Sequence, residues 1–464
     1  MRVNILVPGP QINMYKFSGI RIPQIGPVYL GTVLKNSGFE VKIYDENLTE
    51  LYDKSGLRKE ILDADAFAIS ILTPSASKGY QLAKIIKKQK PDAYIAIGGM
   101  HASALPEEAL KFADCVVVGE GEEVVVDLFK ERPKGIVRTE LVSLDSLPIP
   151  DFFLLENHHL TKYYPILSSR GCPYNCNFCQ VPVLLKRKFR KRSADAVFEE
   201  IQERVEAGQN YLFFNDDIFG LNLDEVLDFL ERVARKNLKL RWATETRADL
   251  VVDHPELVEL MRRTNCRRIH IGIESANPAT LEAYNKKLSL DKIKKCAEIL
   301  NQNQIKINAM FVLGSDEDDE GILKHTIRFI RECKFSSSTA SILYPIPSTP
   351  LYKKLEEENR IITRNWEWYD GTHVVFLPLK IAPIKLQYLW RQFWKKIYNI
   401  RRVQYMFPIR YFLHYWKKLN QEYLKVLKIY ANKPLAELEI TEYLKQLPSW
   451  FRENFKIYNG REMR

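Results

Sequence analysis

Long apolar runs are missing from this sequence, and no part of its 464 residues reaches the ~18 consecutive apolar residues that a membrane-spanning helix needs. A cleavable leader is missing as well, because the first residues pass directly into an apolar strand pattern at 3–7. We therefore expect neither a membrane span nor a signal peptide. The length predicts two or three domains, each with a substantial core.

Nucleic-acid-binding motifs are also missing, although the chain is basic. Lysine and arginine number 69 against 58 acidic residues, which gives a formal net charge of +11 and a pI of about 9.0. The positive charge is dispersed, apart from a basic run at 186–192 that we interpret as a solvated loop and helix entry. Such a surface is compatible with peripheral membrane contact, whereas no nucleic-acid partner is expected.

Cysteine is scarce, with seven residues, and three of them lie together within residues 168–179. Cys172, Cys176 and Cys179 have C-x₃-C-x₂-C spacing directly after the apolar run 164–167. A strand that ends in a compact loop would bring three thiolates into one small volume. Soft ligands of this kind select zinc or an iron–sulfur cluster, but a closed zinc site needs four ligands and no fourth cysteine or histidine lies nearby. The pattern favours a [4Fe–4S] cluster with one open iron over zinc or inert core thiols.

This stretch resembles the cluster motif of radical S-adenosylmethionine (SAM) enzymes, including the aromatic residue Phe178 before the third cysteine. The resemblance implies that SAM chelates the open iron through its amino and carboxylate groups. An electron from the reduced cluster, delivered by a flavodoxin- or ferredoxin-type donor, then cleaves SAM to methionine and a 5′-deoxyadenosyl radical. The other cysteines lie far apart, so we expect a single cluster, and free thiols favour a reducing cytoplasm. These isolated thiols, interpreted as small core residues, are Cys115, Cys266, Cys296 and Cys333.

Apolar runs alternate with helical patterns in residues 1–140. This alternation predicts an α/β domain with a doubly wound, flavodoxin-like parallel sheet, whose ligand-binding loops follow the carboxyl ends of the strands. The predicted strands are 3–7, 40–44, 66–71, 94–97 and 116–118, with helices at 27–37 and 77–90.

Small residues follow two of these strands: Ser70 and Thr73 after the third, and Gly98 and Gly99 after the fourth. Such residues let the backbone approach a bulky ligand closely. Together with residues 119–123, Gly-Glu-Gly-Glu-Glu, they resemble the cobalamin-binding domain. The resemblance implies that Ser70 and Thr73 contact the nucleotide tail of cobalamin and that the glycine pair lies beside it.

The D-x-H-x-x-G motif, whose histidine ligates cobalt in methionine synthase, is absent, because residues 8–27 contain no histidine. We expect cobalamin to bind without a protein histidine on the cobalt. The alternative is that the domain no longer binds cobalamin. His101 is the one histidine in a binding loop, and we do not assign it as a cobalt ligand.

A linker at 141–160, broken by two prolines, separates this domain from a second one at 161–360. The second domain shows six strand–helix units. This pattern predicts a partial (β/α)₆ barrel of the TIM type, with its active site at the carboxyl ends of the strands. The predicted strands are 164–167, 211–214, 240–243, 268–273, 307–313 and 340–344.

Charged residues follow three consecutive strands of the predicted barrel: Asp216 and Asp217, Glu245 and Arg247, and Glu274. The sequences around them resemble strand motifs of the radical SAM family, so we expect all five, together with Phe178, to contribute to a SAM site. One aspartate would accept hydrogen bonds from the ammonium group of SAM, and Arg247 would pair with the SAM carboxylate. Glu274 would accept hydrogen bonds from the ribose hydroxyls. The alternative is that these residues are loop caps and a structural ion pair.

Aromatic and basic residues alternate at helical spacing in the C-terminal region, 361–464, notably at 390–398 and 411–418. These helices form either a lid packed against the barrel or an interfacial membrane surface or apolar substrate tunnel. Residues 370–376 resemble a segment that follows the barrel in cobalamin-binding radical SAM proteins, some of which act on hopanoids and other lipids.

These resemblances lead to three functional hypotheses. The first is a cobalamin-dependent radical SAM methyltransferase that methylates an unactivated carbon of a small or lipid-like substrate, with a methyl group that comes from SAM through cobalamin. The second is an enzyme with the same cofactors but no methyl transfer, such as an oxidative cyclase or a rearrangement catalyst. The third, a non-catalytic cobalamin or redox sensor, is disfavoured by the complete set of barrel strands.

Overall fold

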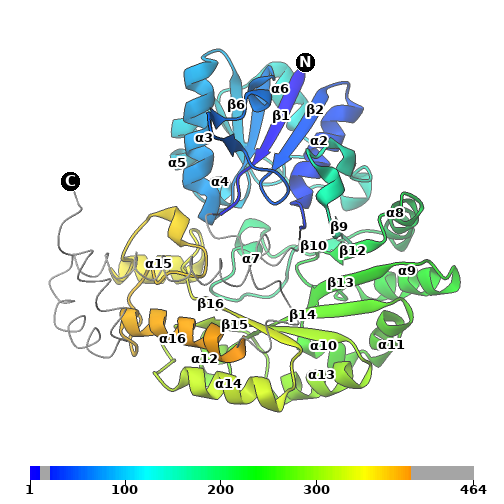
Figure 1. Cartoon of the computed structure of the whole chain (residues 1–464), viewed down its shortest axis with the longest axis vertical. Helices are drawn as coiled ribbons and strands as arrows, with labels where there is room; N and C mark the ends of the chain where they lie inside the picture. Colours follow the sequence, from blue (N-terminus) through cyan, green and yellow to red (C-terminus); the bar gives the residue numbers. More distant parts are fainter. Residues whose placement is uncertain (11–20, 399–464) are drawn as a thin grey trace.

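The computed structural model describes residues 1–10 and 21–398, which form two α/β domains and a helical region after them (Figure 1). The first domain, coloured blue and cyan, stands above the second, coloured green and yellow, and α16 (Pro383–Ile397), in orange, lies along the second domain. The α/β architecture predicted from the alternating strand and helix patterns is confirmed.

The first domain is built on six parallel strands in the order β2-β1-β5-β6-β7-β8. The strand order reverses between β1 and β5, which leaves a crevice at the carboxyl edge where doubly wound domains bind ligands. The sequence did not reveal β8, because its residues are only half-buried and show no apolar run. The elements are β1 (Arg2–Val7), α2 (Ile25–Asn36), β2 (Glu40–Asp45), β5 (Ala66–Ser70), α3 (Ala76–Gln89), β6 (Tyr94–Gly98), α4 (Met100–Ala104), α5 (Pro106–Ala109), β7 (Cys115–Val118), α6 (Val125–Glu131) and β8 (Gly135–Arg138).

The second domain is a partial barrel of six parallel strands that follow one another in chain order. Its first and last strands are the two edges of the sheet, and helices between the strands cover the outside. The strands are β9 (Tyr164–Ile166), β12 (Tyr211–Phe214), β13 (Arg241–Thr246), β14 (Cys266–Glu274), β15 (Lys306–Leu313) and β16 (Ser337–Ile342). The helices are α8 (Ala194–Glu206), α9 (Leu223–Arg235), α10 (Ala248–Asp253), α11 (Pro255–Arg263), α12 (Pro278–Ala283), α13 (Leu290–Gln302) and α14 (Ile322–Glu332).

Side chains along β14 alternate between the two faces of the barrel wall. Ile269, Ile271 and Ile273 are at most 1% exposed and pack into the core beneath the outer helices. Arg268 and His270 occupy the intervening positions and face the lumen of the barrel. Because successive residues of a strand point to opposite faces, the apolar positions stabilise the fold and the polar ones are available to a ligand.

The helix α16 takes the position of the helix after the sixth barrel strand, since it packs against β16 and α14. Leu386 and Phe393 are fully buried in the barrel core. The indole N–H of Trp390 donates to the carbonyl of Ala340 at 2.7 Å. The sequence left open whether this region is a lid packed against the barrel or an interfacial surface or substrate tunnel. The contacts of α16 favour packing against the barrel. The similar pattern at 411–418 lies outside the described residues.

Residues 361–376 reach back to the first domain. Trp366 and Tyr369 belong to the core that packs under β5 and β6, and the Trp366 indole N–H donates to Glu108 at 2.8 Å. Gly371, at φ +75°, lies against β16, where a Cβ atom would come within 2.9 Å of Ser341. This segment therefore ties the two domains together, and the domain ranges expected from the sequence stay a prediction.

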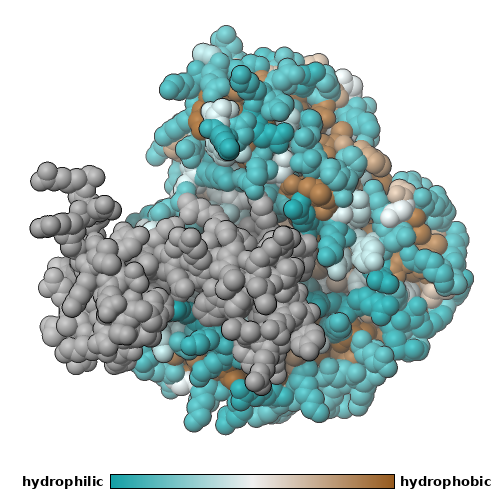
Figure 2. Space-filling view, viewed as in Figure 1, coloured by the Kyte–Doolittle hydropathy of each residue, from teal (hydrophilic) through white to brown (hydrophobic). Residues whose placement is uncertain are grey.

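No helix in residues 1–10 and 21–398 is long and apolar enough to cross a membrane. The described surface in the space-filling view is mostly hydrophilic, with hydrophobic side chains scattered over it (Figure 2).

Candidate functional site

A cavity of about 1120 Å³ lies between the two domains and continues into the barrel. One wall comes from the carboxyl ends of the first sheet, and the opposite wall comes from the carboxyl ends of the barrel strands, where the cluster loop begins. The residues that line it at the junction include Ser70, Gly98, Gly99, Gly119, Glu120, Gly121, Glu122, Arg170, Asn215, Asp217 and Glu245.

Glycines make the wall of the first domain flat. At Gly98, a Cβ atom would meet nothing closer than 3.9 Å, so this residue opens onto the cavity. At Gly99, which has φ +97°, a Cβ atom would lie 2.6 Å from the carbonyl oxygen of Ile71, so only glycine fits. A bulky planar ligand can therefore approach the backbone here, which fits the cobalamin predicted from the sequence.

The two hydroxyl residues predicted to contact cobalamin have different surroundings. Ser70 lines the cavity. Thr73 is 4% exposed and its hydroxyl lies 3.2 Å from Nδ1 of His101, away from the cavity lining. Their predicted contacts with the nucleotide tail stay predictions, with the geometry in favour of Ser70.

His101 is a core residue. It is fully buried, its Nε2 lies 3.4 Å from Glu108, and its ring meets Trp366 edge-on at 5.1 Å. These contacts are consistent with the decision not to assign His101 as a cobalt ligand. Among the described histidines, only His270 lines the cavity, and it lies in the barrel wall.

From this arrangement we predict that the Co(II) state of bound cobalamin has no axial nitrogen ligand. Its electron paramagnetic resonance spectrum should lack nitrogen superhyperfine splitting, because no histidine of the described residues faces the glycine-lined wall. The spectrum of the cobalamin-loaded protein checks this. Clear splitting would contradict it, and His101→Ala would then show whether that buried ring has moved to the cobalt.

The cluster loop begins at a tight turn after β10 (Ser169–Arg170), which pairs with β11 (Arg190–Lys191). Gly171 has φ +100°, and a Cβ atom there would lie 2.1 Å from the carbonyl oxygen of Lys188, so glycine is required. The Gly171 N–H donates to Asp217 at 2.7 Å. The turn thus fixes the point at which Cys172 leaves the barrel.

The three cysteines of the loop are half-buried and form no disulfide. Burial raises the pKa of each thiol, to about 12 for Cys179, and the nearby charges of Cys172 and Cys176 contribute to that rise. Lys286 and Arg247 act in the opposite sense on Cys176. Three free thiols of one short loop beside cationic side chains are a donor set whose chemistry fits an iron–sulfur cluster bound through thiolates.

The two aspartates after β12 have separate environments. Asp216 is 2% exposed and accepts hydrogen bonds from the Ser168 N–H and the Ser169 hydroxyl, both at 2.8 Å, and from the Ser168 hydroxyl. Burial raises its pKa to about 6. Asp217 lines the cavity, and one of its oxygens accepts the Gly171 N–H. Asp216 therefore braces the strand ends, while Asp217 faces the space where SAM is expected.

Glu245 and Glu274 lie at the ends of the next two strands. Glu245 lines the cavity, and burial raises its pKa to about 7, with further contributions from the charges of Asp217 and Glu274. Glu274 has φ +64°, where the register of β14 shifts against β15, and accepts from the Lys286 ammonium group at 2.7 Å. Three carboxylates thus meet near the cluster loop.

Arg247 is held by the protein itself. It is 5% exposed, forms a two-point ion pair with Asp249 at 3.0 and 2.8 Å, and donates to the carbonyl of Lys286 at 3.3 Å. Its guanidinium also stacks on Tyr174 of the cluster loop, 3.8 Å from the ring centre. The predicted role of Arg247 in binding the SAM carboxylate stays a prediction beside this evident role in holding the loop.

Phe178 packs against Tyr284 with ring centres 4.9 Å apart, in a small apolar group with Leu343 and Leu351. This packing does not test the contact of Phe178 with SAM, which stays a prediction.

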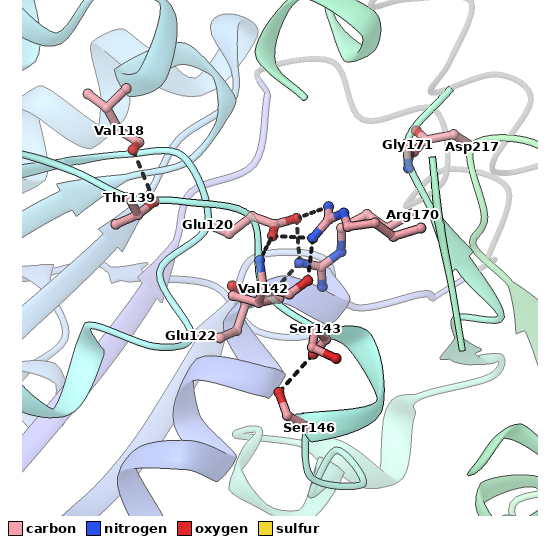
Figure 3. Close-up of polar contacts among 11 residues, drawn as sticks. Val118, Glu120, Glu122, Thr139, Val142, Ser143, Ser146, Arg170, Gly171 and Asp217 are labelled. Atoms are coloured by element: carbon pink, nitrogen blue, oxygen red, sulfur yellow. Dashed lines mark hydrogen bonds and ion pairs between the residues drawn. The ribbon is translucent and has the colours of Figure 1, made fainter. Parts of the chain in front are cut away.

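A set of buried ion pairs between the domains was missed by the sequence reasoning. Figure 3 shows Glu120 and Glu122 of the first domain beside Arg170, which directly precedes the cluster loop. Arg170 pairs with both glutamates at 2.9 Å, and Arg190 pairs with Glu120 at 2.6 Å. The N–H of Val142 donates to Glu120 at 2.8 Å. We call Glu120, Glu122, Arg170 and Arg190 the interdomain clasp. The Gly-Glu-Gly-Glu-Glu segment was visible in the sequence, but its partners were not.

The raised pKa of Glu245 makes stability depend on pH. Folded protein holds the proton up to about pH 7, whereas the unfolded chain releases it near the ordinary value of 4.5. Stability therefore falls as the pH rises from 4.5 to 7, because the folded state binds more protons there. Glu245→Gln should gain about 2 kcal/mol over the wild type at pH 8 and much less at pH 5. Thermal unfolding without SAM at both pH values measures the difference, and an equal gain at both would contradict it.

Comparison with known families decides the identity of both domains. Residues 18–129 match the family described as the B12 binding domain, and residues 166–329 match the Radical SAM superfamily. The chain is a radical SAM enzyme with a B12-binding domain. Its cofactors are a [4Fe–4S] cluster, SAM and cobalamin, as the cysteine spacing and the glycine-bearing loops predicted.

Three relatives illustrate the chemistry found among similar radical SAM proteins. The chain is 29% identical to bacteriochlorophyllide d C-12(1)-methyltransferase of Chlorobaculum tepidum, over 82% of this chain and 84% of that protein. It is 30% identical to hopanoid C-2 methylase of Rhodopseudomonas palustris, over 58% and 54%. It is 26% identical to anaerobic magnesium-protoporphyrin IX monomethyl ester cyclase of Cereibacter sphaeroides, over 72% and 61%.

Among solved structures, the fold is similar to that of the cobalamin-dependent SAM radical enzyme OxsB, with aqua-cobalamin and SAM bound. The TM-score is 0.65 at 15% identity, over 96% of this chain and 75% of that one. This likeness concerns the fold and includes the arrangement of both domains.

Proposed function

We propose that this radical SAM enzyme methylates an unactivated carbon of a small or lipid-like substrate. The observation that carries the proposal is the single cavity that joins the glycine wall of the B12-binding domain to the cluster end of the barrel. A substrate in that cavity would lie between the two cofactors. Two of the three relatives named above are methylating enzymes, one for a tetrapyrrole and one for a hopanoid.

When bound, the cofactors supply a 5′-deoxyadenosyl radical that removes a substrate hydrogen and a methyl group that comes from SAM through cobalamin. The protein holds and orients them. Cys172, Cys176 and Cys179 anchor the cluster. Asp217 is the aspartate we assign to the SAM ammonium group, because Asp216 has both oxygens occupied by Ser168 and Ser169.

The remaining SAM contacts are assigned by position. Glu245 opens onto the cavity beside Asp217, and a hydrogen bond from SAM would stabilise its ionised form. Glu274 already accepts one hydrogen bond from Lys286 and has lone pairs left for a ribose hydroxyl. Arg247 keeps the loop in place through Tyr174 and Asp249, and we assign its contact with the SAM carboxylate only as a secondary one.

The interdomain clasp fixes the distance between the cofactors. Glu120 and Glu122 lie on the segment that closes the B12-binding wall, and Arg170 lies two residues before Cys172. Side chains of Glu120 and Glu122 are 7% and 5% exposed, so the ion pairs are shielded from water. Loss of one partner would leave a buried charge without its counter-ion, which is costly. The clasp therefore keeps the two walls of the cavity in register.

A second candidate reaction is oxidative cyclisation or rearrangement without methyl transfer. The relationship to the magnesium-protoporphyrin IX monomethyl ester cyclase supports it, because that protein matches 72% of this chain. The two candidates use the same cofactors and the same cavity. The products, and not the geometry, distinguish them.

Bacteriochlorophyllide d and a hopanoid serve as probe substrates for the test, with SAM that carries a deuterated methyl group. Turnover is run anaerobically with cluster- and cobalamin-loaded protein and a chemical reductant. Methylation predicts S-adenosylhomocysteine, 5′-deoxyadenosine and a probe heavier by one deuterated methyl group. An altered probe without added methyl, accompanied by 5′-deoxyadenosine alone, would support the second candidate instead.

Three further assignments are part of the proposal. The electron donor is a small flavodoxin- or ferredoxin-type protein, since the cluster needs one electron for each SAM cleaved. The protein works in the reducing cytoplasm, where none of its seven cysteines forms a disulfide. Peripheral contact with anionic membranes through the dispersed basic surface is compatible with a lipid-like substrate.

A further inference from the structure

The cavity does not end at the cofactor site but extends through the barrel lumen to the opposite, amino ends of the strands. Phe213, Ala243 and His270 also line it. The residues that line its far end include Tyr211, Arg241, Arg267, Arg268, Gln304 and Lys306. The far end therefore carries a group of basic side chains, here called the basic mouth: Arg241, Arg267, Arg268 and Lys306.

Among residues 1–10 and 21–398, no carboxylate lies within ion-pair distance of the four cations of the basic mouth. The buried Arg192 and Arg204, by contrast, both pair with Glu200. Arg241 donates to the Tyr211 hydroxyl at 3.2 Å and lies over that ring. The charge of the basic mouth is therefore not neutralised by the part of the chain that the structure describes.

The backbone brings these charges together. Arg268 stands directly beside Lys306 in the parallel register of β14 and β15, where like charges on neighbouring strands destabilise a sheet. The register of β13 and β14 shifts between Trp242 and Ala243, so that Arg267 is an extra residue beside Arg268. Such bulges redirect side chains. An anion held between these groups would remove the repulsion.

Charge changes sign along the lumen. The cofactor end carries the carboxylates Asp217 and Glu245, whereas the far end carries the basic mouth. His270 stands beside Glu245 in the register of β13 and β14, and burial together with the charge of Arg268 lowers its pKa to about 4, so it is neutral at pH 7. A ligand with one anionic end is therefore directed to lie with that end away from the cofactors.

The length of the lumen sets the size of such a ligand. Arg241 and Glu245, which both line the cavity, lie near the two ends of β13 (Arg241–Thr246). At about 3.3 Å per residue their positions are roughly 13 Å apart. A molecule that spans this distance is larger than an amino acid or a nucleobase and matches an extended amphiphile.

We propose that the barrel lumen is a substrate tunnel for an elongated amphiphile with an anionic end group. The carboxylate or phosphate of this substrate pairs with Arg268 and Lys306, and its apolar body lies along Phe213 and Ala243. The carbon that is modified lies at the other end of the substrate. This inference rests on the proposed function and names its substrate class.

Binding, and not turnover, tests the tunnel. Dodecanoate, dodecyl phosphate and the neutral 1-dodecanol are titrated into cluster- and cobalamin-loaded protein by calorimetry, below their aggregation limits. At least one anionic probe should bind more tightly than dodecanol, and the tighter of the two identifies the end group. Equal binding of all three would overturn the proposal, because no anion site would then exist.

Variants locate the binding. Arg268→Gln should lower the affinity for the tighter anionic probe by at least about tenfold, and Arg268→Lys should lower it much less. Ala243→Leu should also lower the affinity, because the larger side chain narrows the lumen. Arg235→Gln is the matched control, because Arg235 lies on the outer helix α9 with its side chain 74% exposed. Wild-type affinity in Arg268→Gln, or an equal loss in Arg235→Gln, would overturn the tunnel. Formation of S-adenosylhomocysteine in the same samples without any amphiphile tests the proposed function separately.

Discussion

Cys176→Ala protein, reconstituted anaerobically, should retain almost no iron, whereas the wild type should bind about four irons per chain. In the proposed ligand set each cysteine of the loop would hold one iron, and the fourth iron would be left for SAM. Loss of one thiolate leaves two ligands in a half-buried loop, too few to hold a cluster against exchange. SAM cleavage should be lost with the iron. Iron and sulfide analysis and the visible absorption of the cluster measure the result.

Cys296→Ala is the matched control for this experiment. Cys296 is 1% exposed and lies on α13, where it packs in the apolar core of the barrel outside the cluster loop. The variant should lose some stability but keep about four irons. About eight irons in the wild type would contradict a single cluster, and wild-type iron in Cys176→Ala would contradict the ligand set.

Asp217→Asn should slow SAM cleavage by on the order of 10²-fold, because it removes the charge that we assign to the SAM ammonium group in the cavity. Asparagine keeps an oxygen for the Gly171 N–H, so the cluster loop should stay in place. Iron content and melting temperature should therefore match the wild type. Formation of 5′-deoxyadenosine under reducing conditions measures the rate.

The neighbouring carboxylate provides the control. Asp216→Asn should cleave SAM within a few-fold of the wild type, since Asp216 points to Ser168 and Ser169 and lies outside the cavity lining. If Asp216→Asn is the slow variant and Asp217→Asn is normal, the assignment of the two aspartates is reversed. If both cleave SAM normally, neither contacts it.

The sequence was sufficient for the elements whose cause is local. The cysteine spacing and the apolar runs of the strands act within a few residues, so they could be recognised without the fold. Gly99 was visible as part of a glycine pair after a strand, but the neighbour that demands glycine there, Ile71, follows a different strand.

Features that depend on distant partners could not be predicted. Adjacent aspartates at 216 and 217 look equivalent in sequence, and only the packing of Ser168 and Ser169 separates them. Thr73 matched a ligand-contact position but is buried against His101, 28 residues away. The interdomain clasp joins residues 50 positions apart, Glu120 and Arg170. The basic mouth depends on strand register, which the sequence does not state.

Methyl transfer is tested most directly by S-adenosylhomocysteine formation without substrate. Protein loaded with cluster and cobalamin is incubated anaerobically with SAM and a strong reductant, beside a sample loaded with the cluster alone. Both samples should form 5′-deoxyadenosine, which shows that the cluster cleaves SAM, and only the cobalamin-loaded sample should also form S-adenosylhomocysteine. If the cobalamin-loaded sample forms 5′-deoxyadenosine but no S-adenosylhomocysteine, the protein is not a cobalamin-dependent methyltransferase.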